Sequence, residues 1–421
     1  MIFFLLRKIR PSLTGLTVHD ALAGTDSRAA KPRRILLFPS AYYPNFGGVE
    51  EICRLLAQTL SRRGFEVAIA VNRWPADAKE FEVVWDIPVY RFDFAAPGKK
   101  DIWQIWRMLP RSQKFNRFVE QWQPDLIHAI CPSISGFYLW LSQLQHKRPV
   151  MLTFQGELFM DAHDIFGKSA FARWSLRQLL TVTDSITACS QYVLDDASRR
   201  FALPDVAKTV VFNGVDLSES QSVDPSIAQT NAQKYILGVG RVVKNKNFDT
   251  LVRAFALIAQ EYADFQLVLA GDGDQLPVLR KLADQLKISH RINFAGKQDR
   301  AGIGKLFADC TCFVIPSAVE PFGIVCLEAM RAGKATIACN AGGPPEFISN
   351  GENGLLVAPR EPEELAQALR LLLSDSDLRR RLEAKALSDV QAFSWTKITS
   401  QYIDNYQQCF SKKSASMEAV K

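Results

Sequence analysis

The chain has 421 residues, of which 48% are hydrophobic and 23% charged, as expected for a globular protein with room for two domains. No window reaches the roughly 20 consecutive apolar residues of a membrane-spanning helix. Eight cysteines without a Cys-x-x-Cys spacing and only five histidines argue against a zinc framework. Unpaired cysteines fit a reducing cytosol, so we expect a cytoplasmic location.

The net charge of +7 arises in the first half of the chain. Residues 1–210 carry 27 Lys and Arg against 20 Asp and Glu, whereas the remainder balances at 24 against 24. This bias indicates either an anionic partner, such as a phosphorylated acceptor or the acidic inner face of a membrane, or ordinary surface charge. The apolar and then basic segment Met1–Arg10 has the wrong order for a secretory signal. It is either a frayed extension or a short membrane anchor.

Strand-like apolar runs alternate with amphipathic helical runs along the chain. In the first half the predicted strands are Arg34–Pro39, Phe65–Val71, Val83–Phe92, Leu126–Ile130, Val150–Phe154, Ser185–Ala188 and Val210–Phe212. The predicted helices include Val49–Arg63, Ile102–Trp122 and Ala170–Thr183. In the second half the predicted strands are Tyr235–Gly240, Gln266–Ala270, Ile292–Ala295, Cys310–Ile315, Ala335–Ala338 and Leu355–Val357. This alternation predicts an α/β fold with two doubly wound, Rossmann-like domains.

A turn signal at Asn213–Asp216, followed by a polar stretch, places the boundary between these domains. We therefore expect the following segments: an extension over residues 1–32, domains over 33–213 and 214–392, a C-terminal helix over 393–410 and a tail over 411–421.

The predicted helix Ile102–Trp122 mixes five aromatic with four basic side chains. This composition resembles a helix that lies on a membrane surface. The aromatic spacing of three residues suits packing on a sheet equally well. We favour the second interpretation, because a doubly wound sheet needs covering helices.

The first candidate site is the pair Gly47-Gly48, which follows a predicted strand and opens a helix. Glycines at such a junction let the backbone approach a phosphate, toward which the helix directs its positive end. Tight turns explain most isolated pairs of this kind, so the signal is weak alone.

The second candidate site is cationic. Arg241 follows a predicted strand and Lys246 lies on the next loop, which suits a diphosphate group. A dinucleotide fingerprint is excluded, because Val243 stands where its third glycine is required. The acidic residues Asp272 and Asp274 are interpreted as part of a strand-end turn, and we assign no metal.

The most informative site holds two acids, Glu320 and Glu328, around the segment Phe322–Val325. If residues 321–328 were all helical, Glu328 would lie about 12 Å along the axis and about 80° around it. This separation is too large for two acids sharing one bond. It suits two acids that bind different parts of one elongated ligand, with backbone N–H groups at the helix start holding phosphate oxygens.

The chain resembles the family 4 retaining glycosyltransferases of the two-domain GT-B fold from residue 33 to about residue 410. Their acidic signature is two glutamates separated by seven residues. The matching segments, in chain order, are Gly47-Gly48, Pro124–His128, Asn213–Asp216, Gly240-Arg241 with Lys246, Gly271–Gly273, Gly296, Glu320 to Glu328, and Asn353-Gly354.

The resemblance implies a role for each site residue. Arg241 and Lys246 would neutralise the donor diphosphate, and Glu320 would contact the transferred sugar. Glu328 would bind the ribose hydroxyls of the nucleotide. The remaining donor contacts would come from Gly47 and Gly48 and from the backbone around Phe322, Gly323, Ile324 and Val325. The C-terminal helix would cross back onto the first, acceptor-side domain.

One departure from the family pattern lies in Thr153–Glu157, where Gln155 replaces a common histidine. Glutamine can bind a hydroxyl group but cannot accept a proton, so Gln155 is expected to position the donor sugar. The candidates for acceptor contact are Glu157, Asp161, His163 and Asp164. His128 is expected to be structural.

The resemblance thus implies a retaining, metal-independent enzyme without a cofactor. It would move a sugar from a UDP- or GDP-sugar to a glycan or lipid-linked acceptor in cell-surface polysaccharide synthesis, and no nucleic-acid partner is expected. A nucleotide-sugar epimerase of the same architecture and a non-catalytic partner subunit are the alternatives. The intact residues Arg241, Lys246, Glu320 and Glu328 argue against the last.

Overall fold

The computed structural model describes residues 33–45, 47–94, 108–160, 164–218 and 234–418, with side chains as far as residue 411. The predicted N-terminal extension, the first six residues of the predicted helix Ile102–Trp122, Asp161 and His163 lie outside the described residues. From Arg33 onward the described residues form one compact unit. Within that unit the strands are divided between two sheets.

The first sheet has eight strands. Their order is β3 (Phe81–Val84), β4 (Ile87–Phe92), β2 (Glu66–Asn72), β1 (Arg34–Pro39), β5 (Leu126–Ile130), β6 (Val150–Phe154), β7 (Ser185–Ala188) and β8 (Ala207–Val210). Every pair is parallel except β3–β4. Strands β5, β6 and β7 are buried along their whole length, as expected for a sheet covered on both faces.

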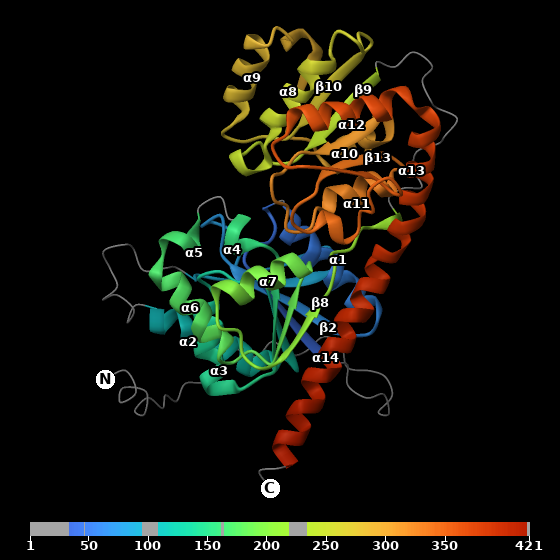
Figure 1. The fold of residues 1–421 in the computed structure, drawn as a ribbon. Coiled ribbons are helices and arrows are strands. Elements are labelled where there is room, and N and C mark those ends of the chain that lie inside the picture. The colour runs from blue at the N-terminus through green and yellow to red at the C-terminus, as the bar shows by residue number, and fades with distance from the viewer. Residues whose placement is uncertain (1–32, 46, 95–107, 161–163, 219–233, 419–421) are drawn as a thin grey trace. The chain divides into compact units, whose positions relative to one another are not determined.

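Alternate residues of these strands enter two separate hydrophobic cores. Leu36 and Phe38 of β1 face a core formed with α2 (Met108–Trp122), α3 (Gly136–His146) and α6 (Ala170–Leu180). Ile35 and Leu37 face the opposite core, formed with α1 (Gly48–Arg62) and α14 (Trp395–Glu418). The two-residue period of the strand therefore decides which helix layer each side chain contacts. Figure 1 shows α2, α3 and α6 grouped together, away from α1 and α14.

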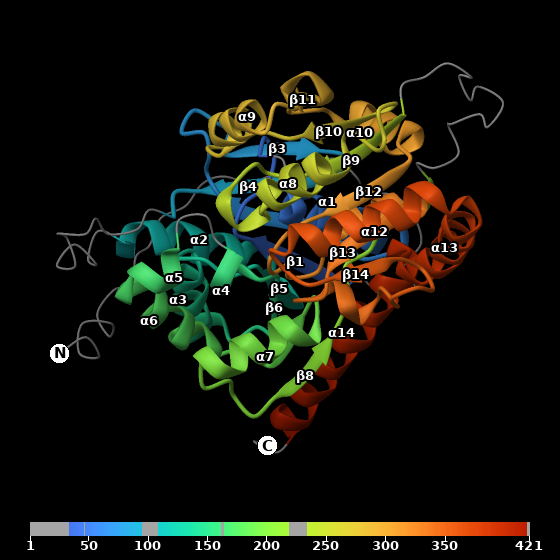
Figure 2. The ribbon, with the colours of Figure 1, turned by 45° about the horizontal axis from the view of Figure 1, so that its top comes forward.

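The second sheet has six strands, all parallel. Their order is β11 (Ile292–Gly296), β10 (Phe265–Ala270), β9 (Lys234–Val239), β12 (Cys312–Ile315), β13 (Ala335–Cys339) and β14 (Leu355–Val357). Helices α8 (Phe248–Ile258), α9 (Leu276–Gln285) and α12 (Pro362–Ser374) pack on one face. Helices α10 (Arg300–Asp309) and α11 (Ile324–Arg331) cover the other. Figure 2 shows α8 and α12 in front of the second sheet, on the same face. The predicted α/β fold with two Rossmann-like sheets is confirmed.

Two predicted strands were wrong. The segment Val83–Phe92 is a hairpin, because Trp85 and Asp86 adopt φ angles of 51° and 64° and reverse the chain between β3 and β4. A Trp-Asp pair carries no recognisable turn signal. The strand predicted at Val210–Phe212 lies earlier, at Ala207–Val210. Its apolar signal is weak because Lys208 and Thr209 are exposed at the sheet edge.

Helix α2 covers the first sheet, as favoured for residues 108–122. Its buried residues include Phe115 and Val119. Two of its basic residues are paired at the surface: Arg111 lies 3.0 Å from Asp93 and Lys114 2.6 Å from Glu80. Among the described residues, no helix is both long and apolar enough to cross a bilayer.

The C-terminal helix α14 is anchored through a buried polar contact with β5. His128 is fully buried, and its Nδ1 atom lies 2.8 Å from the Tyr406 hydroxyl of α14. Its Nε2 atom lies 2.6 Å from the hydroxyl of Thr153. Burial lowers the pKa of His128 to about 3, so the imidazole is neutral at physiological pH. The structural role expected for His128 agrees with these contacts.

Tyr406→Phe is expected to lower the free energy of unfolding by about 1–3 kcal/mol, because the buried His128 Nδ1 atom loses its partner. Chemical denaturation measures this change. Tyr262→Phe is the control, since that tyrosine is only half-buried and its hydroxyl lies at the long distance of 3.5 Å from the Arg370 carbonyl. A loss no larger than that of the control would show that the contact does not anchor α14.

Candidate functional site

A cavity of about 470 Å³ lies where strands of both sheets end. Its lining includes Ser40, Cys131 and Gln155, which follow β1, β5 and β6 of the first sheet. It also includes Gly240 after β9 and Glu320 after β12 of the second sheet. Ligands of parallel sheets bind at the carboxyl ends of the strands, and the volume is typical of a small-molecule site.

Most residues that the sequence singled out line this cavity. They are Gly47, Gly48, Gln155, Glu157, Arg241, Lys246, Glu320, Phe322, Gly323, Ile324 and Val325. Glu328 is half-buried on α11 and Asp164 is exposed before α5 (Ile165–Lys168); neither is a lining residue. Their roles, and those of Asp161 and His163, stay predictions.

Lys246 and Glu320 form an ion pair inside the cavity. Lys246 Nζ lies 2.5 Å from Glu320 Oε2, and the two side chains are only 15% and 12% exposed. Lys246 ends the short 3-10 helix η5 (Lys244–Lys246), and Glu320 follows β12. The pair joins the residues predicted to bind diphosphate and sugar, so a ligand with both groups would contact both members of the pair.

Arg241 is the exposed cation of the cavity. It follows β9 and forms none of the ion pairs found among the described residues. Burial raises the pKa of Glu50, and the nearby charge of Arg241 partly offsets this effect. The guanidinium group therefore has its hydrogen-bond donors available for an anion.

Close packing of glycines positions the loop that carries Arg241. A Cβ atom on Gly271 would lie 1.8 Å from the Gly240 carbonyl oxygen, and one on Gly273 would lie 2.2 Å from that of Val242. Only glycine allows the loop after β10 to approach the loop after β9 this closely. Asp272 and Asp274 follow β10, and the Leu276 N–H donates a hydrogen bond of 3.2 Å to the Gly273 carbonyl, so a turn around Asp274 closes this loop as predicted.

The segment between Glu320 and Glu328 is only partly helical. Helix α11 begins at Ile324, after Gly323 in a left-handed conformation with φ of 97°. The helical separation considered for the two acids therefore does not apply. The expected helix start at Phe322–Val325 is confirmed, and Gly323 supplies no side-chain cap for the first N–H groups.

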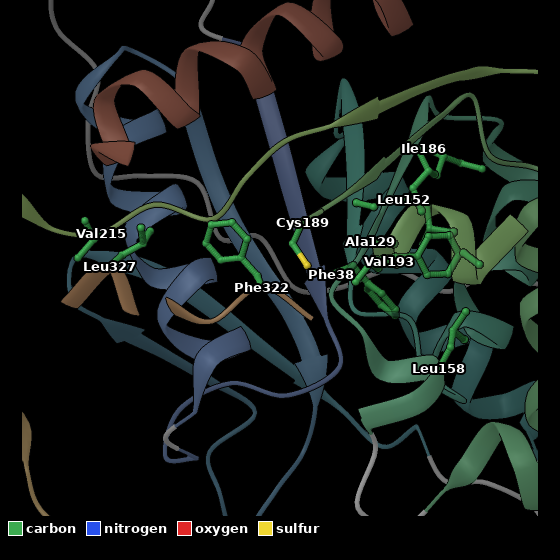
Figure 3. Close-up of a cluster of buried hydrophobic side chains, with 14 of the residues drawn as sticks. Phe38, Ala129, Leu152, Leu158, Ile186, Cys189, Val193, Val215, Phe322 and Leu327 are labelled. Carbon is green, nitrogen blue, oxygen red and sulfur yellow. The ribbon is translucent and has the colours of Figure 1, made fainter. Parts of the chain in front are cut away.

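Phe322 lines the cavity and also anchors this segment in the hydrophobic core. It is 2% exposed, and its ring centroid lies 4.9 Å from that of Phe347 and 5.6 Å from that of Phe212. Figure 3 shows it within the buried cluster that also contains Leu327 and Cys189. Packing of the ring fixes the backbone N–H groups that follow it.

Three hydrogen bonds connect this segment and the nearby Glu346 to the residues that follow β7 of the first sheet. Ser190 Oγ donates a hydrogen bond of 2.6 Å to the Pro321 carbonyl. The Glu346 carboxylate accepts hydrogen bonds from the backbone N–H groups of Gln191 and Tyr192, which start α7 (Gln191–Arg200). A carboxylate is favourable there because the N-terminal N–H groups of a helix lack internal partners.

Gln155 is held by a residue that the sequence did not identify as part of the site. The side-chain amides of Gln155 and Asn213 exchange two hydrogen bonds of 3.1 and 2.9 Å, and both residues line the cavity. From its sequence pattern, Asn213 is assigned to a turn and is given no role in the site. Its position in a segment matched by the family resemblance was the available clue to a site role.

Glu157 contributes a carboxyl group whose pKa is raised above its ordinary value. Its Oε2 atom accepts a hydrogen bond from the Gln155 backbone N–H, and its Oε1 atom is buried without a hydrogen-bond partner among the described residues. Burial raises the pKa of Glu157 to about 8. The carboxyl is therefore largely neutral at pH 7 and can donate a hydrogen bond to a ligand in the cavity.

Glu157→Gln is expected to reduce the pH dependence of stability between about pH 4.5 and 8. In this window the folded protein keeps a proton on Glu157 that the unfolded chain releases, so the free energy of unfolding falls as pH rises. Glutamine removes this titration. Unfolding curves at pH 5 and pH 8 measure it, with exposed Glu363→Gln as control. An unchanged pH slope in Glu157→Gln would contradict the raised pKa.

Within the described part of the chain, no group of three or more His, Cys, Asp and Glu side chains is arranged to hold a metal ion. The candidate site is thus built from one ion pair, one unpaired arginine, one neutral carboxyl group, a side-chain amide pair and the N–H groups that start α11. This set can bind an elongated ligand with a diphosphate and a hydroxyl-bearing ring.

Comparison with known proteins agrees with this architecture. Residues 47–214 match a family described as glycosyl transferase 4-like domain, and residues 221–389 match the glycosyl transferases of group 1. An uncharacterized glycosyltransferase of Methanocaldococcus jannaschii is 27% identical over 86% of this chain and 94% of its own length. The N-acetyl-alpha-D-glucosaminyl L-malate synthase of Bacillus anthracis is 25% identical over 86% and 93%.

Solved structures share the fold. Sucrose-phosphate synthase from Thermosynechococcus elongatus aligns with a TM-score of 0.76 and 24% identity, covering 90% of this chain and 100% of that one. Anabaena HepE, in complex with UDP and glucose, aligns with a TM-score of 0.72 and 22% identity over 89% and 99%.

Proposed function

The chain belongs to the glycosyl transferases of group 1, and from this premise we propose that it moves a sugar from a UDP- or GDP-sugar to a glycan or lipid-linked acceptor. The observation that carries the proposal is the meeting of Arg241, Lys246 and Glu320 in one cavity. Two cations suit a diphosphate, and a carboxylate beside them suits a sugar hydroxyl.

Arg241 and Lys246 stabilise the negative charge that develops on the leaving diphosphate, with help from the N–H groups at Gly323 and Ile324. Once the diphosphate attracts Lys246, Glu320 can accept a hydrogen bond from a hydroxyl of the transferred sugar. Gln155, fixed by Asn213, orients the same sugar. Gly47 and Gly48 bring backbone close to the phosphates, and Glu328 is proposed to bind the ribose.

In the reaction the acceptor oxygen bonds to the anomeric carbon as the bond from that carbon to the diphosphate oxygen breaks. The electron pair of the broken bond leaves with the diphosphate, and the acceptor proton passes to a phosphate oxygen. We propose that attack from the side of the leaving group retains the anomeric configuration. Gln155 cannot accept the proton, which supports the phosphate as the base.

Relatives support the donor and the pathway class. HepE is crystallised with UDP-glucose and with UDP and glucose. Two lipopolysaccharide core glycosyltransferases of Rhizobium meliloti are 37% and 34% identical over 44% and 46% of this chain. A cytoplasmic enzyme of cell-surface polysaccharide synthesis, in peripheral contact with an anionic membrane, is consistent with the basic first half of the chain.

The proposal is tested by incubating purified protein with UDP- and GDP-sugars and a panel of saccharide acceptors, with and without EDTA. We expect a glycoside whose anomeric configuration, read by NMR, is that of the donor, with undiminished yield in EDTA. An inverted product would contradict retention, and loss of yield in EDTA would contradict metal independence. Conversion of the donor sugar without acceptor would show an epimerase instead.

A further inference from the structure

A second cavity, of about 240 Å³, adjoins the first. Met160 lines both cavities. Asn245 and Val319 line the second cavity, and the residues that follow them, Lys246 and Glu320, line the first. The second cavity therefore lies immediately beyond the ion pair at which the donor sugar is proposed to bind.

The side chains that line the second cavity are suited to binding a sugar ring. Phe159 and Tyr192 form an edge-to-face pair with ring centroids 5.6 Å apart, and both line the cavity. Asn245 Nδ2 contacts the Met160 sulfur at 3.4 Å, while its Oδ1 atom is buried without a hydrogen-bond partner among the described residues. A ligand hydroxyl would satisfy that oxygen, whose isolation is otherwise unfavourable.

The charge of the second cavity is positive. Arg200 lines it and lies 2.8 Å from Asp196, which also lines it. Arg360 lines it as well and takes part in none of the ion pairs seen in the described chain. Two cations against one carboxylate leave one arginine fork available to an anionic group of the ligand.

We propose that this second cavity is the acceptor subsite and that it selects a sugar carrying a carboxylate or a phosphate group. The inference rests on the proposed function, because it takes the first cavity as the donor site. The acceptor ring contacts Phe159 and Tyr192, a hydroxyl donates to Asn245, and Arg360 binds the anion. The hydroxyl to be glycosylated then points past Met160 toward the donor sugar.

The test is saturation-transfer NMR with three probes, glucose, glucuronate and glucose 6-phosphate, in the presence of saturating UDP. UDP occupies the diphosphate site, so binding of the charged probes reports the second cavity. We expect the glucuronate or the glucose 6-phosphate Kd to be at least about tenfold lower than that of glucose, as for one charge-assisted contact. Comparison of the two charged probes identifies which anion is preferred.

Arg360→Ala is expected to remove this preference, whereas Arg253→Ala, an exposed arginine of α8 that lines neither cavity, should keep it. UDP affinity is measured on the same samples. If wild-type protein binds neither UDP nor GDP, the proposed donor site itself is wrong; if it binds only GDP, the three probes are compared in saturating GDP instead. If UDP binds but glucose competes equally with the charged probes, or Arg360→Ala behaves like Arg253→Ala, the acceptor assignment is overturned. Weakened UDP binding in Arg360→Ala would place the second cavity in the donor site and would also overturn it.

Discussion

Arg241→Ala is expected to lower kcat/KM for the nucleotide-sugar donor by about 10²–10³-fold, the loss typical of removing one preorganised group from a developing oxyanion. Arg241 is exposed in the cavity, and its charge is available to the leaving diphosphate. Steady-state kinetics with saturating acceptor measures the effect. Most of it should fall on kcat, since charge on the leaving group grows toward the transition state.

Arg241→Lys and Arg253→Ala are the matched variants for this experiment. Lysine keeps the charge but loses the two-pronged donor geometry, so an intermediate loss is expected. Arg253→Ala removes an exposed arginine of α8, on the same sheet as Arg241, and this arginine does not line the cavity. The stability of Arg241→Ala should equal that of wild type, because no ion pair of the described residues involves it. If Arg241→Ala turns over substrate as fast as wild type, Arg241 has no role in the reaction.

Lys246→Ala should impair both activity and stability. It takes one cation from the diphosphate, and it leaves the Glu320 carboxylate, 9% exposed, without the partner now 2.5 Å away. An uncompensated carboxylate in such surroundings is costly, and we expect the free energy of unfolding to fall by about 2 kcal/mol. Kinetics and chemical denaturation on the same preparation measure the two effects.

A double variant separates the two causes. Lys246→Ala combined with Glu320→Gln removes the isolated charge, so it should recover most of the lost stability. It should not recover activity, because both the cation and the sugar-binding carboxylate are absent. Recovery of activity in the double variant would show that the ion pair only supports the fold.

Much of the fold could be predicted because burial on two faces leaves a strong signal. Strands such as Leu126–Ile130 and Val150–Phe154 each have four apolar residues out of five, and their predicted bounds agree with β5 and β6. Edge elements leave a weaker signal. The β3–β4 hairpin turns at Trp85 and Asp86, whose positive φ angles depend on tertiary context rather than on a glycine.

In the site, too, features that follow from local sequence could be predicted, and contacts between distant residues could not. Arg241, Lys246 and Glu320 could be named because each follows a predicted strand, and parallel strands bring their carboxyl ends together. The ion pair between Lys246 and Glu320 could not be predicted from the sequence, because the two residues are 74 positions apart. The raised pKa of Glu157 depends on its burial, which the sequence does not encode locally.

The central claim, that the cavity around Arg241, Lys246 and Glu320 binds a nucleoside diphosphate sugar, is tested most directly by thermal unfolding with UDP, GDP, ADP and their glucose conjugates. A ligand present at about 100 times its Kd stabilises the folded state by about 2.7 kcal/mol. We predict that one nucleotide series raises the Tm of the wild type and that Arg241→Ala loses this increase. An unchanged Tm with every nucleotide and sugar conjugate, in a folded wild-type protein, would contradict the account.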